Sequence, residues 1–578
     1  MSQPSSTISI SQFVPQPLKG MLFSPSGIVL LLALVVLAAL NYSGQGKKGK
    51  LARAWFGGRR EKRAARKLAC QQMEAREHNK VALYIGTPSG SSVEEIDGKK
   101  VVNLPQDPKT IYIPHAEEGI LAVGRPGSGK TYSSIDPLVR SAIDQGFPVF
   151  YYDFKGHEDP APSSKLVGYA AERGYKISIF APGSKETCVC NPLDFLSGPG
   201  DAEMAYQLAS VLNQNFKLDD SSSANSSFFT QTGNQLVQAI LMLAKGSRYP
   251  DIAMCHKILA LPNLIQRLRA AKLDPYLKVA FDNFLSSAGS PETAASIATT
   301  ASLMFTRFMT PQVLAAFCGQ TTLPLDVEGR HFIVFRMDPQ KRSVIGPLLA
   351  ATLHLTINRN IFRQRKTPLI VSLDELPSID LPMLADWLNQ NRSSGMVCIV
   401  GFQALGFLEE TYGEKKVNGI LSGCTTQMIF QLNDQQTAEY YSKQLGNEEI
   451  QYKQKSRSHG KGGASYSSAQ QQQTRSLVEI QDVQQFPKGK CILLNPGYGD
   501  PKKEIRVPLV QQVKIPKRDI NAMKKSAAMW TQIKTQLIKK STAREPPGEE
   551  LELREMVARN LLPDPEDVQK AKEYKARY

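Results

Sequence analysis

One eight-residue segment constrains the fold of this chain more than any other feature. Residues 124–131 read GRPGSGKT, which matches the pattern G-x-x-x-x-G-K-[ST] at every defined position. An apolar run at residues 119–123 precedes the segment, and a helical pattern at residues 132–145 follows it. A strand, a glycine-rich loop and a helix in this order predict an α/β domain that binds phosphate groups at the start of the helix.

The residue types of this loop fit the phosphates of ATP and a magnesium ion. Glycines allow backbone N–H groups to surround the β-phosphate, Lys130 reaches the β- and γ-oxygens, and the Thr131 hydroxyl binds Mg²⁺. We therefore predict that ATP and Mg²⁺ bind here; a glycine-rich turn that arose by chance is the alternative. The predicted nucleotide-binding residues are Gly124, Arg125, Pro126, Gly127, Ser128, Gly129, Lys130 and Thr131.

A second apolar run, residues 369–373, ends in the carboxylates Asp374 and Glu375. The ligand site of a doubly wound sheet lies at the carboxyl ends of its strands. Asp374 is therefore predicted to hold Mg²⁺ through water, and Glu375 to polarise the attacking water as the catalytic base. Adjacent strand residues point in opposite directions, so both acids can serve one site only if a turn follows, and Leu376 and Pro377 supply it. The alternative is a strand end with solvated acids.

The next apolar run, residues 396–402, ends in the amide of Gln403. If this strand lies beside the strand that carries Asp374, Gln403 would be near the γ-phosphate and could sense hydrolysis. The alternative is an amide that caps the following helix.

The strand-like runs are interrupted once, which divides the folded part of the chain. Residues 81–200 and 321–512 contain short apolar runs separated by helical patterns, as in a parallel sheet with crossover helices. Residues 201–320 are rich in Ala, Leu and Gln with helical periodicity, so an inserted all-α domain is predicted. Residues 451–473 are low in complexity and are expected to form a mobile loop. Residues 513–578 are expected to form a charged, helical and exposed C-terminal tail.

The N-terminal region predicts a membrane anchor. Ile28–Leu40 is apolar without interruption, and residues 21–42 are long enough for one transmembrane helix through about 30 Å of hydrocarbon. Residues 1–20 form a short external tail, and residues 43–80 are a basic juxtamembrane segment. The positive-inside rule places this basic side and the bulk of the chain in the cytoplasm, below a single-pass anchor. A cleaved signal peptide is the alternative.

The charge of the chain indicates an anionic partner. Lys and Arg number 70 against 53 Asp and Glu, a formal charge of +17. DNA and an anionic membrane surface are the standard attractors, and residues 47–80 are expected to lie along lipid headgroups, with DNA contact as the alternative. The eight Cys include no Cys-x-x-Cys, so neither a zinc site nor a disulfide framework is expected.

A series of further motifs resembles the TraG/TraD family, the coupling-protein ATPases of conjugation and type IV secretion. In order, they are D-x-K-G at 153–156, N-P-L at 191–193, L-D-E-x-P at 373–377, R-S-S-G at 392–395, G-x-Q at 401–403, Y-G at 412–413 and T-A-x-x-x-S-x-x-x-G at 437–446. The resemblance covers roughly residues 119–500. The chain departs from the family in having His157 where Glu is common, and in showing one predicted membrane span where many members have two.

The resemblance implies a RecA-like P-loop NTPase domain with an inserted all-α domain, and a homo-hexameric ring in the bacterial inner membrane. It also implies ATP hydrolysis coupled to the translocation of relaxase-bound DNA into a type IV secretion channel. The insertion would select the relaxase or other relaxosome proteins. The family's trans-acting arginine has no clear motif here; Arg125, Arg336 and Arg392 are candidates, and Arg392 is preferred because it follows the carboxylates by one helix.

Two other functions remain open from the sequence. A chromosome DNA pump of the FtsK/SpoIIIE type shares the motor core, but it usually has several membrane helices and a C-terminal winged helix. A nucleotide-gated receptor would dock substrates without pumping; the presence of Lys130, Thr131, Asp374 and Glu375 argues against a loss of hydrolysis.

Overall fold

The structure, a computed structural model, describes residues 54–96, 99–217, 227–460, 463–500 and 505–569. The described chain divides into two compact units, one of which holds residues 446–477 and the other residues 55–445 with 478–569. The external tail and membrane helix expected at residues 1–42 lie outside the described residues. Among the helices that are described, none is both long and apolar enough to cross a membrane.

The larger unit is built on a nine-stranded sheet in the order β17-β14-β11-β5-β10-β9-β6-β8-β7. The strands from β11 to β7 in this order are parallel, and β14 and β17 join one edge in antiparallel orientation. The bounds are β5 Ile120–Val123, β6 Val149–Asp153, β7 Lys176–Phe180, β8 His331–Arg336, β9 Leu369–Leu373, β10 Met396–Phe402, β11 Thr426–Ile429, β14 Lys490–Leu494 and β17 Leu509–Gln512.

These segments form central strands because their apolar runs can be buried on both faces of the sheet. Every residue of β5, β6, β9, β10 and β11 is buried. On one face, side chains of the sheet share a core with α4 (Asp136–Asp144), α5 (Ser164–Glu172) and α19 (Trp530–Lys540). The α/β fold predicted from the alternating pattern is confirmed, and the strand that ends at Gln403 pairs with both β5 and β9, as expected.

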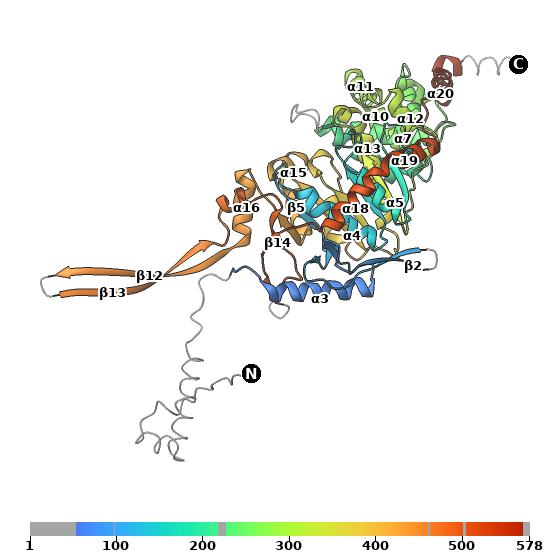
Figure 1. Cartoon of the computed structure of the whole chain (residues 1–578). Helices are drawn as coiled ribbons and strands as arrows, with labels where there is room; N and C mark the ends of the chain where they lie inside the picture. Colours follow the sequence, from blue (N-terminus) through green and yellow to red (C-terminus); the bar gives the residue numbers. More distant parts are fainter. Residues whose placement is uncertain (1–53, 97–98, 218–226, 461–462, 501–504, 570–578) are drawn as a thin grey trace, which may run out of the picture. The chain divides into compact units, whose positions relative to one another are not determined.

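Between β7 and β8, the described residues form helices and no strand (Figure 1). The helices are α6 Ala202–Lys217, α7 Ser227–Lys245, α8 Ile252–Leu259, α9 Leu264–Ala270, α10 Pro275–Ser286, α11 Pro291–Arg307 and α12 Pro311–Phe317. They belong to the same compact unit as the sheet. The first of them packs against the buried helix α13 (Arg342–Ile361), and Asn215 exchanges two hydrogen bonds of 2.8 and 2.9 Å with the backbone of Asp380.

The expectation of a mobile loop at residues 451–473 is wrong. Residues 447–476 form a two-stranded antiparallel ribbon, β12 Asn447–Gly460 and β13 Gly463–Ser476, paired from one end to the other. The sequence offers no apolar alternation that would indicate strands. The ribbon is held by the backbone N–H and C=O groups of each strand that face the other strand, and this pairing needs no apolar alternation.

The C-terminal segment is helical, as predicted, but it is not simply exposed. α18 (Lys517–Ala528) packs on α5, and α20 (Gly548–Leu561) packs on α8. Buried ion pairs also hold both helices: Asp519 of α18 lies 3.3 Å from Arg140 of α4, and Arg554 of α20 lies 2.6 Å from Asp251 at the start of α8. The alternating charges predict an exposed surface, whereas several charged residues of this segment pair with partners far away in the sequence.

The segment after residue 54 begins with α3 (Arg59–Ala75), which is the basic helix expected there. Glu61 caps it by accepting a hydrogen bond of 2.7 Å from the backbone N–H of Gly58. Two small antiparallel pairs follow, β1 Leu83–Ile85 with β4 Ile111–Ile113, and β2 Ser92–Ile96 with β3 Lys99–Asn103. The remaining helices are α14 Leu384–Gln390, α15 Leu405–Gly423, α16 Gln435–Leu445 and α17 Ile480–Gln484.

Candidate nucleotide site at the carboxyl edge of the sheet

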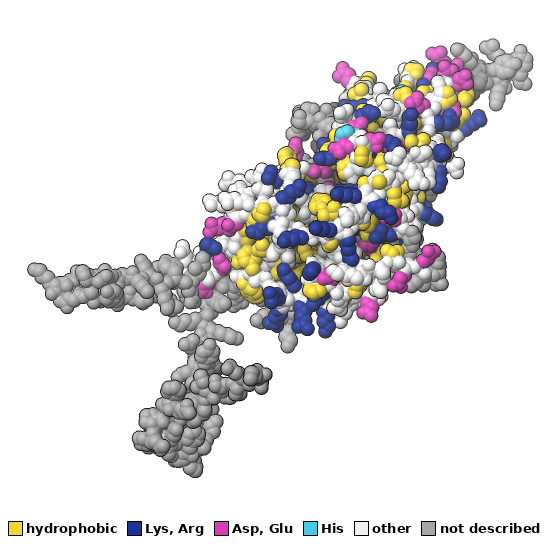
Figure 2. Space-filling view, viewed as in Figure 1, with side chains coloured by type: hydrophobic (Ala, Val, Ile, Leu, Met, Phe, Trp, Pro, Cys, Tyr) yellow, Lys and Arg dark blue, Asp and Glu magenta, His cyan; other side chains and the backbone are white. Residues whose placement is uncertain are grey.

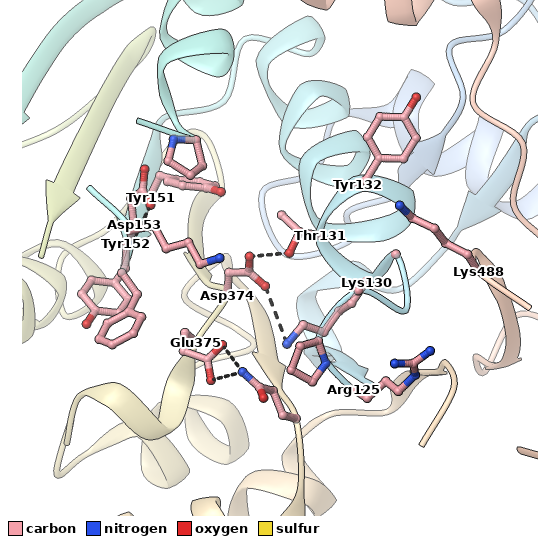
Figure 3. A pocket seen from close by; sticks show the side chains of 17 residues that line it. Arg125, Lys130, Thr131, Tyr132, Tyr151, Tyr152, Asp153, Asp374, Glu375 and Lys488 are labelled. Atoms are coloured by element: carbon pink, nitrogen blue, oxygen red, sulfur yellow. Dashed lines mark hydrogen bonds and ion pairs between the residues drawn. The ribbon is translucent and has the colours of Figure 1, made fainter. Parts of the chain in front are cut away.

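A cavity of about 380 Å³ opens where β5, β6, β9 and β10 end (Figure 3). We call it the P-loop cavity. It is lined by Arg125, Pro126, Gly127, Gly129, Lys130, Thr131, Tyr132, Tyr151, Tyr152, Asp153, Phe154, Lys155, Pro162, Asp374, Glu375, Gln403 and Lys488. Parallel strands deliver their carboxyl ends to one edge, so residues far apart in the sequence meet there.

The glycine-rich loop has the backbone that phosphate binding requires. Gly129 has φ +97°, a left-handed conformation that side-chain-bearing residues rarely adopt. The chain then enters a helical turn with π-type hydrogen bonds at Thr131–Ile135, which continues into α4. The first N–H groups of such a helix lack partners within the helix and favour an anion at this end. The Lys130 ammonium is buried and donates to the carbonyl oxygen of Phe402 at 3.2 Å.

Thr131 and Asp374 are brought into direct contact. The Thr131 hydroxyl donates to Asp374 Oδ2 at 2.6 Å, and Asp374 Oδ1 lies 3.9 Å from Lys130 Nζ. Loss of hydration raises the pKa of Asp374, an effect that Lys130 and the Thr131 hydrogen bond oppose. Gly401 permits this close approach of β9 and β10, because a Cβ there would lie 2.3 Å from the Asp374 carbonyl oxygen.

The contact between Thr131 and Asp374 fits a magnesium ion. Asp374 Oδ1 is buried and, among the described residues, accepts no hydrogen bond. Mg²⁺ prefers hard oxygen ligands with several waters retained, and a hydroxyl beside a carboxylate with a free oxygen supplies such a set. The donor set therefore fits the ion predicted from the sequence.

Glu375 is held by Gln403. The amide Nε2 of Gln403 donates to both carboxylate oxygens of Glu375, at 3.2 and 3.0 Å. A 3₁₀ turn at Leu376–Ser378 follows at once, and the backbone carbonyl of Glu375 accepts a hydrogen bond from Ser378 Oγ at 2.5 Å. This turn allows Asp374 and Glu375 to line one cavity. Leu376 and Pro377 predict such a turn from the sequence.

Several lining residues had no role assigned from the sequence. Asp153 and Lys155 belong to the D-x-K-G motif at the end of β6, and Asp153 accepts the backbone N–H groups of Lys155 and Ser163 at 3.1 and 2.9 Å. Lys488 lies in the turn before β14, where the N–H of Gly489 donates to the Ser128 carbonyl oxygen at 2.9 Å. The motif could have indicated Lys155, but no pattern marks Lys488.

The arginine candidates lie in three different environments. Arg125 lines the cavity. Arg336 is buried at the end of β8, where it donates to Ser163 and Ser164 and lies over the ring of Trp530, so it is not accessible to a neighbouring chain. Arg392 lies before β10, at the opposite end of that strand from Gln403, and is not part of the cavity wall of its own chain.

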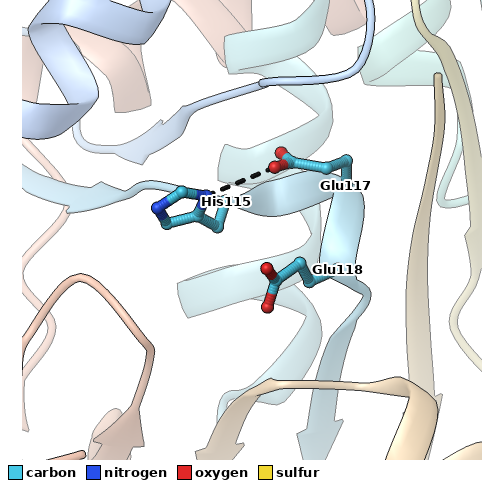
Figure 4. A group of neighbouring side chains, drawn as sticks. All are labelled: His115, Glu117 and Glu118. Carbon is cyan, nitrogen blue, oxygen red and sulfur yellow. Dashed lines mark hydrogen bonds and ion pairs between the residues drawn. The ribbon is translucent and has the colours of Figure 1, made fainter. Parts of the chain in front are cut away.

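A second polar group lies in the turn before β5, where His115, Glu117 and Glu118 place their ligand atoms within 4.8 Å of one another (Figure 4). Glu117 accepts the N–H of Val81 at 2.8 Å and faces His115 Nδ1 at 3.3 Å. The hydrogen bond with Glu117 raises the pKa of His115. These contacts connect the turn before β5 to Val81, two residues before β1, so the group has a structural explanation.

The sheet, the glycine-rich loop and the carboxylates at one edge define an α/β protein of the P-loop NTPase type. Residues 110–508 match the family described as the type IV secretion-system coupling protein DNA-binding domain. Because this match covers well over half of the chain, the protein belongs to the type IV secretion-system coupling protein family. The resemblance identified from the ordered motifs is confirmed, and the chromosome-pump alternative is not favoured.

Curated relatives match a shorter region. The coupling protein TraD of Escherichia coli (strain K12) is 29% identical over 160 residues, which is 26% of this chain and 22% of TraD. The conjugal transfer protein TraG of Agrobacterium fabrum is 30% identical over 158 residues, 27% of this chain and 23% of that protein. The aligned regions thus span less than a quarter of these relatives.

Solved structures of the bacterial conjugative coupling protein TrwB share the fold. An unbound monoclinic form has a TM-score of 0.53 at 14% identity, covering 77% of this chain and 91% of that one. The complex of TrwB with ADP and Mg²⁺ has a TM-score of 0.52 at 16% identity, covering 70% and 86%.

Proposed function

We propose that this protein is a membrane-anchored ATPase that couples relaxase-bound DNA to a type IV secretion channel and drives its translocation during conjugation. The proposed ATPase activity is supported mainly by the contacts of two carboxylates that line the P-loop cavity. Asp374 touches Thr131 of the phosphate-binding loop, while Glu375 is oriented separately by Gln403. These separate contacts support a role for Asp374 with a metal ion and a role for Glu375 with water.

The chain's own groups divide the work of hydrolysis. The loop N–H groups and Lys130 neutralise the β- and γ-phosphates, and Thr131 and Asp374 would hold Mg²⁺, directly and through water. Thr131 and Asp374 would thereby position an ion that would supply neutralisation of the phosphate charge. Glu375 orients the attacking water and accepts its proton, while Gln403 fixes the carboxylate and registers the loss of the γ-phosphate.

The partners follow from the family and from charge. The matched family is described by its DNA-binding domain, and relatives are named as conjugal transfer and coupling proteins. A net charge of +17 suits sequence-independent contacts to single- or double-stranded DNA. We further propose a RecA-like homo-hexamer anchored by residues 21–42 in the bacterial inner membrane, with relaxosome proteins bound by the all-α insertion at residues 201–320.

In such a ring, Arg392 is proposed to reach the nucleotide of the neighbouring subunit. It is absent from the cavity of its own chain, as a residue acting across an interface must be. Arg392→Ala should then lower hydrolysis about a thousandfold in the assembled protein. The affinity of the unassembled chain for nucleotide should not change in this variant. If the assembled and the unassembled protein both lost nucleotide binding to the same extent, Arg392 would have a structural role.

The direct test of the whole proposal is plasmid transfer between cells. Lys130→Ala should abolish transfer while leaving the protein in the membrane fraction, because the phosphates lose their charged contact. Lys185→Ala, an exposed lysine outside the P-loop cavity, is the matched control and should transfer normally. Transfer at wild-type frequency by the Lys130 variant would refute a hydrolysis-driven coupling role and favour a docking receptor.

A further inference from the structure

A second pocket, of about 370 Å³, lies along α3 and shares no lining residue with the P-loop cavity. We call it the α3 pocket. It is lined by Arg59, Lys62, Arg63, Arg66, Pro108, Lys109, Thr110, Ile111, Tyr498 and Gln511. Its floor is rigid, because the Tyr498 hydroxyl is buried and donates to the carbonyl oxygen of Tyr112 at 2.6 Å.

The charge of the α3 pocket is unbalanced. Five of its lining residues are Lys or Arg and none is Asp or Glu. Within the described part of the chain, none of the five forms an ion pair; the one hydrogen bond of their side chains runs from Lys62 Nζ to Gln511 Oε1 at 3.1 Å. Figure 2 shows basic side chains gathered over this helix. Like charges that converge on a pocket repel one another, so an anion placed among them is strongly favoured.

Two exposed aromatic residues stand at the start of the same helix. Trp55 and Phe56 are 44% and 41% exposed, and they are adjacent in the sequence. They are held in place because the N–H of Gly57 donates to the Pro508 carbonyl oxygen at 2.9 Å. Aromatic residues beside a cluster of Lys and Arg are typical of a protein surface at the membrane–water interface.

We propose that the α3 pocket binds the phosphate headgroup of an anionic phospholipid, with Trp55 and Phe56 inserted among the neighbouring lipids. The apolar run Ile28–Leu40 ends shortly before this helix, so the membrane is near in sequence. A pocket of this limited volume suits one headgroup better than a DNA strand, which needs a continuous basic track. The inference rests on the proposed membrane location, but it does not depend on nucleotide hydrolysis.

The test uses the full chain in phospholipid nanodiscs. The protein has three Trp, and Trp387 and Trp530 are 1% and 4% exposed, so quenching of tryptophan fluorescence by brominated lipids reports on Trp55. Brominated phosphatidylglycerol should quench more strongly than brominated phosphatidylcholine at equal content. Trp55→Phe should remove this difference, which would confirm that the quenched fluorescence comes from Trp55.

Two double charge reversals on α3 distinguish lipid binding in the pocket from general electrostatic attraction by the whole helix. Arg63→Glu/Arg66→Glu changes two lining residues, whereas Arg60→Glu/Lys67→Glu makes the same change in charge at residues outside the lining. The first should raise the phosphatidylglycerol content needed for half-maximal quenching at least about tenfold, and the second less than about threefold. Lys130→Ala should behave as the wild type, so failure of the proposed ATPase would not affect this result.

Three outcomes would overturn the proposal. Equal losses in the two double variants would show a diffuse electrostatic field. Release of the lipid by inorganic phosphate at the same concentration as by soluble short-chain phosphatidylglycerol would show an unspecific phosphate site. Displacement by a single-stranded oligonucleotide at lower concentrations than by that lipid would assign the surface to DNA.

Discussion

The P-loop cavity and the α3 pocket have nearly equal volumes, about 380 and 370 Å³, and both expose basic side chains. They differ in their acids. Asp153, Asp374 and Glu375 line the first, whereas the second contains no carboxylate. Cations alone can hold an anion, but a hydrolytic site must also bind a metal ion and activate water, and carboxylates serve both purposes. The acids, rather than the basic residues, therefore distinguish the P-loop cavity and support the hydrolytic role proposed for it.

The two sites also differ in how firmly their charged groups are held. Both proposed catalytic carboxylates of the P-loop cavity have a partner within it, Thr131 for Asp374 and Gln403 for Glu375. The arginines of α3 are free of ion pairs with the described residues and project from a single helix. Side chains fixed in one position are suited to catalysing a reaction with a defined geometry. Basic side chains without fixed partners are suited to binding lipid headgroups of different shapes.

The largest expected difference follows from Glu375→Gln. This change keeps the shape of the side chain and removes the base, so hydrolysis should fall about 10²- to 10⁴-fold while nucleotide binding persists. Lipid quenching at Trp55 should not change. Steady-state phosphate release and nucleotide binding measure the effect, with Arg63→Glu/Arg66→Glu as the control that should hydrolyse normally. Hydrolysis within about threefold of wild type would remove Glu375 from the mechanism.

Acid should affect the two sites differently. Burial raises the pKa of Asp374, and the protonated form is a poor metal ligand, so ionisation is lost at a higher pH than for an ordinary carboxyl group. Below that pKa, kcat/KM for ATP should fall about tenfold per pH unit. Lipid binding at the α3 pocket should be constant over the same range, because Lys and Arg remain charged. A parallel decline of both would point to acid unfolding instead.

The smallest expected effect concerns stability. Lys62 and Arg66 are one turn apart on α3, and like charges at this spacing destabilise a helix by about 0.2–0.5 kcal/mol. Arg66→Gln should therefore slightly raise the midpoint of thermal unfolding at low salt, and the gain should vanish at high salt. Lys130→Gln should not stabilise the protein, because it removes a charge that faces Asp374. A loss of stability in Arg66→Gln would show that its charge is already neutralised.

The arrangement of the P-loop cavity could be predicted from the sequence. The phosphate-binding loop is a contiguous motif, and Asp374 and Gln403 each end an apolar run. Because parallel strands share one carboxyl edge, the convergence of these residues required only that β10 lie between β5 and β9, as it does. The roles of Arg392 and of the helical insertion at residues 201–320 remain proposals.

The rest depended on contacts that no local pattern encodes. The Arg554 ion pair with Asp251 joins residues about 300 positions apart, so the charges of α20 resembled a solvated face. The polar ribbon of β12 and β13 is held by backbone pairing, which leaves no periodicity in the sequence. Lys488 reaches the P-loop cavity from a turn between α17 and β14, where a lysine carries no signal.

The central claim is that hydrolysis at the P-loop cavity is coupled to DNA. It is tested most directly by steady-state ATP hydrolysis of the full chain in nanodiscs, with no DNA, with single-stranded DNA and with double-stranded DNA, at two salt concentrations. We expect DNA to stimulate hydrolysis, the stimulation to fade with salt because phosphate contacts are screened, and Glu375→Gln to abolish it. Hydrolysis that is indifferent to both forms of DNA at either salt concentration would contradict a DNA-coupled motor.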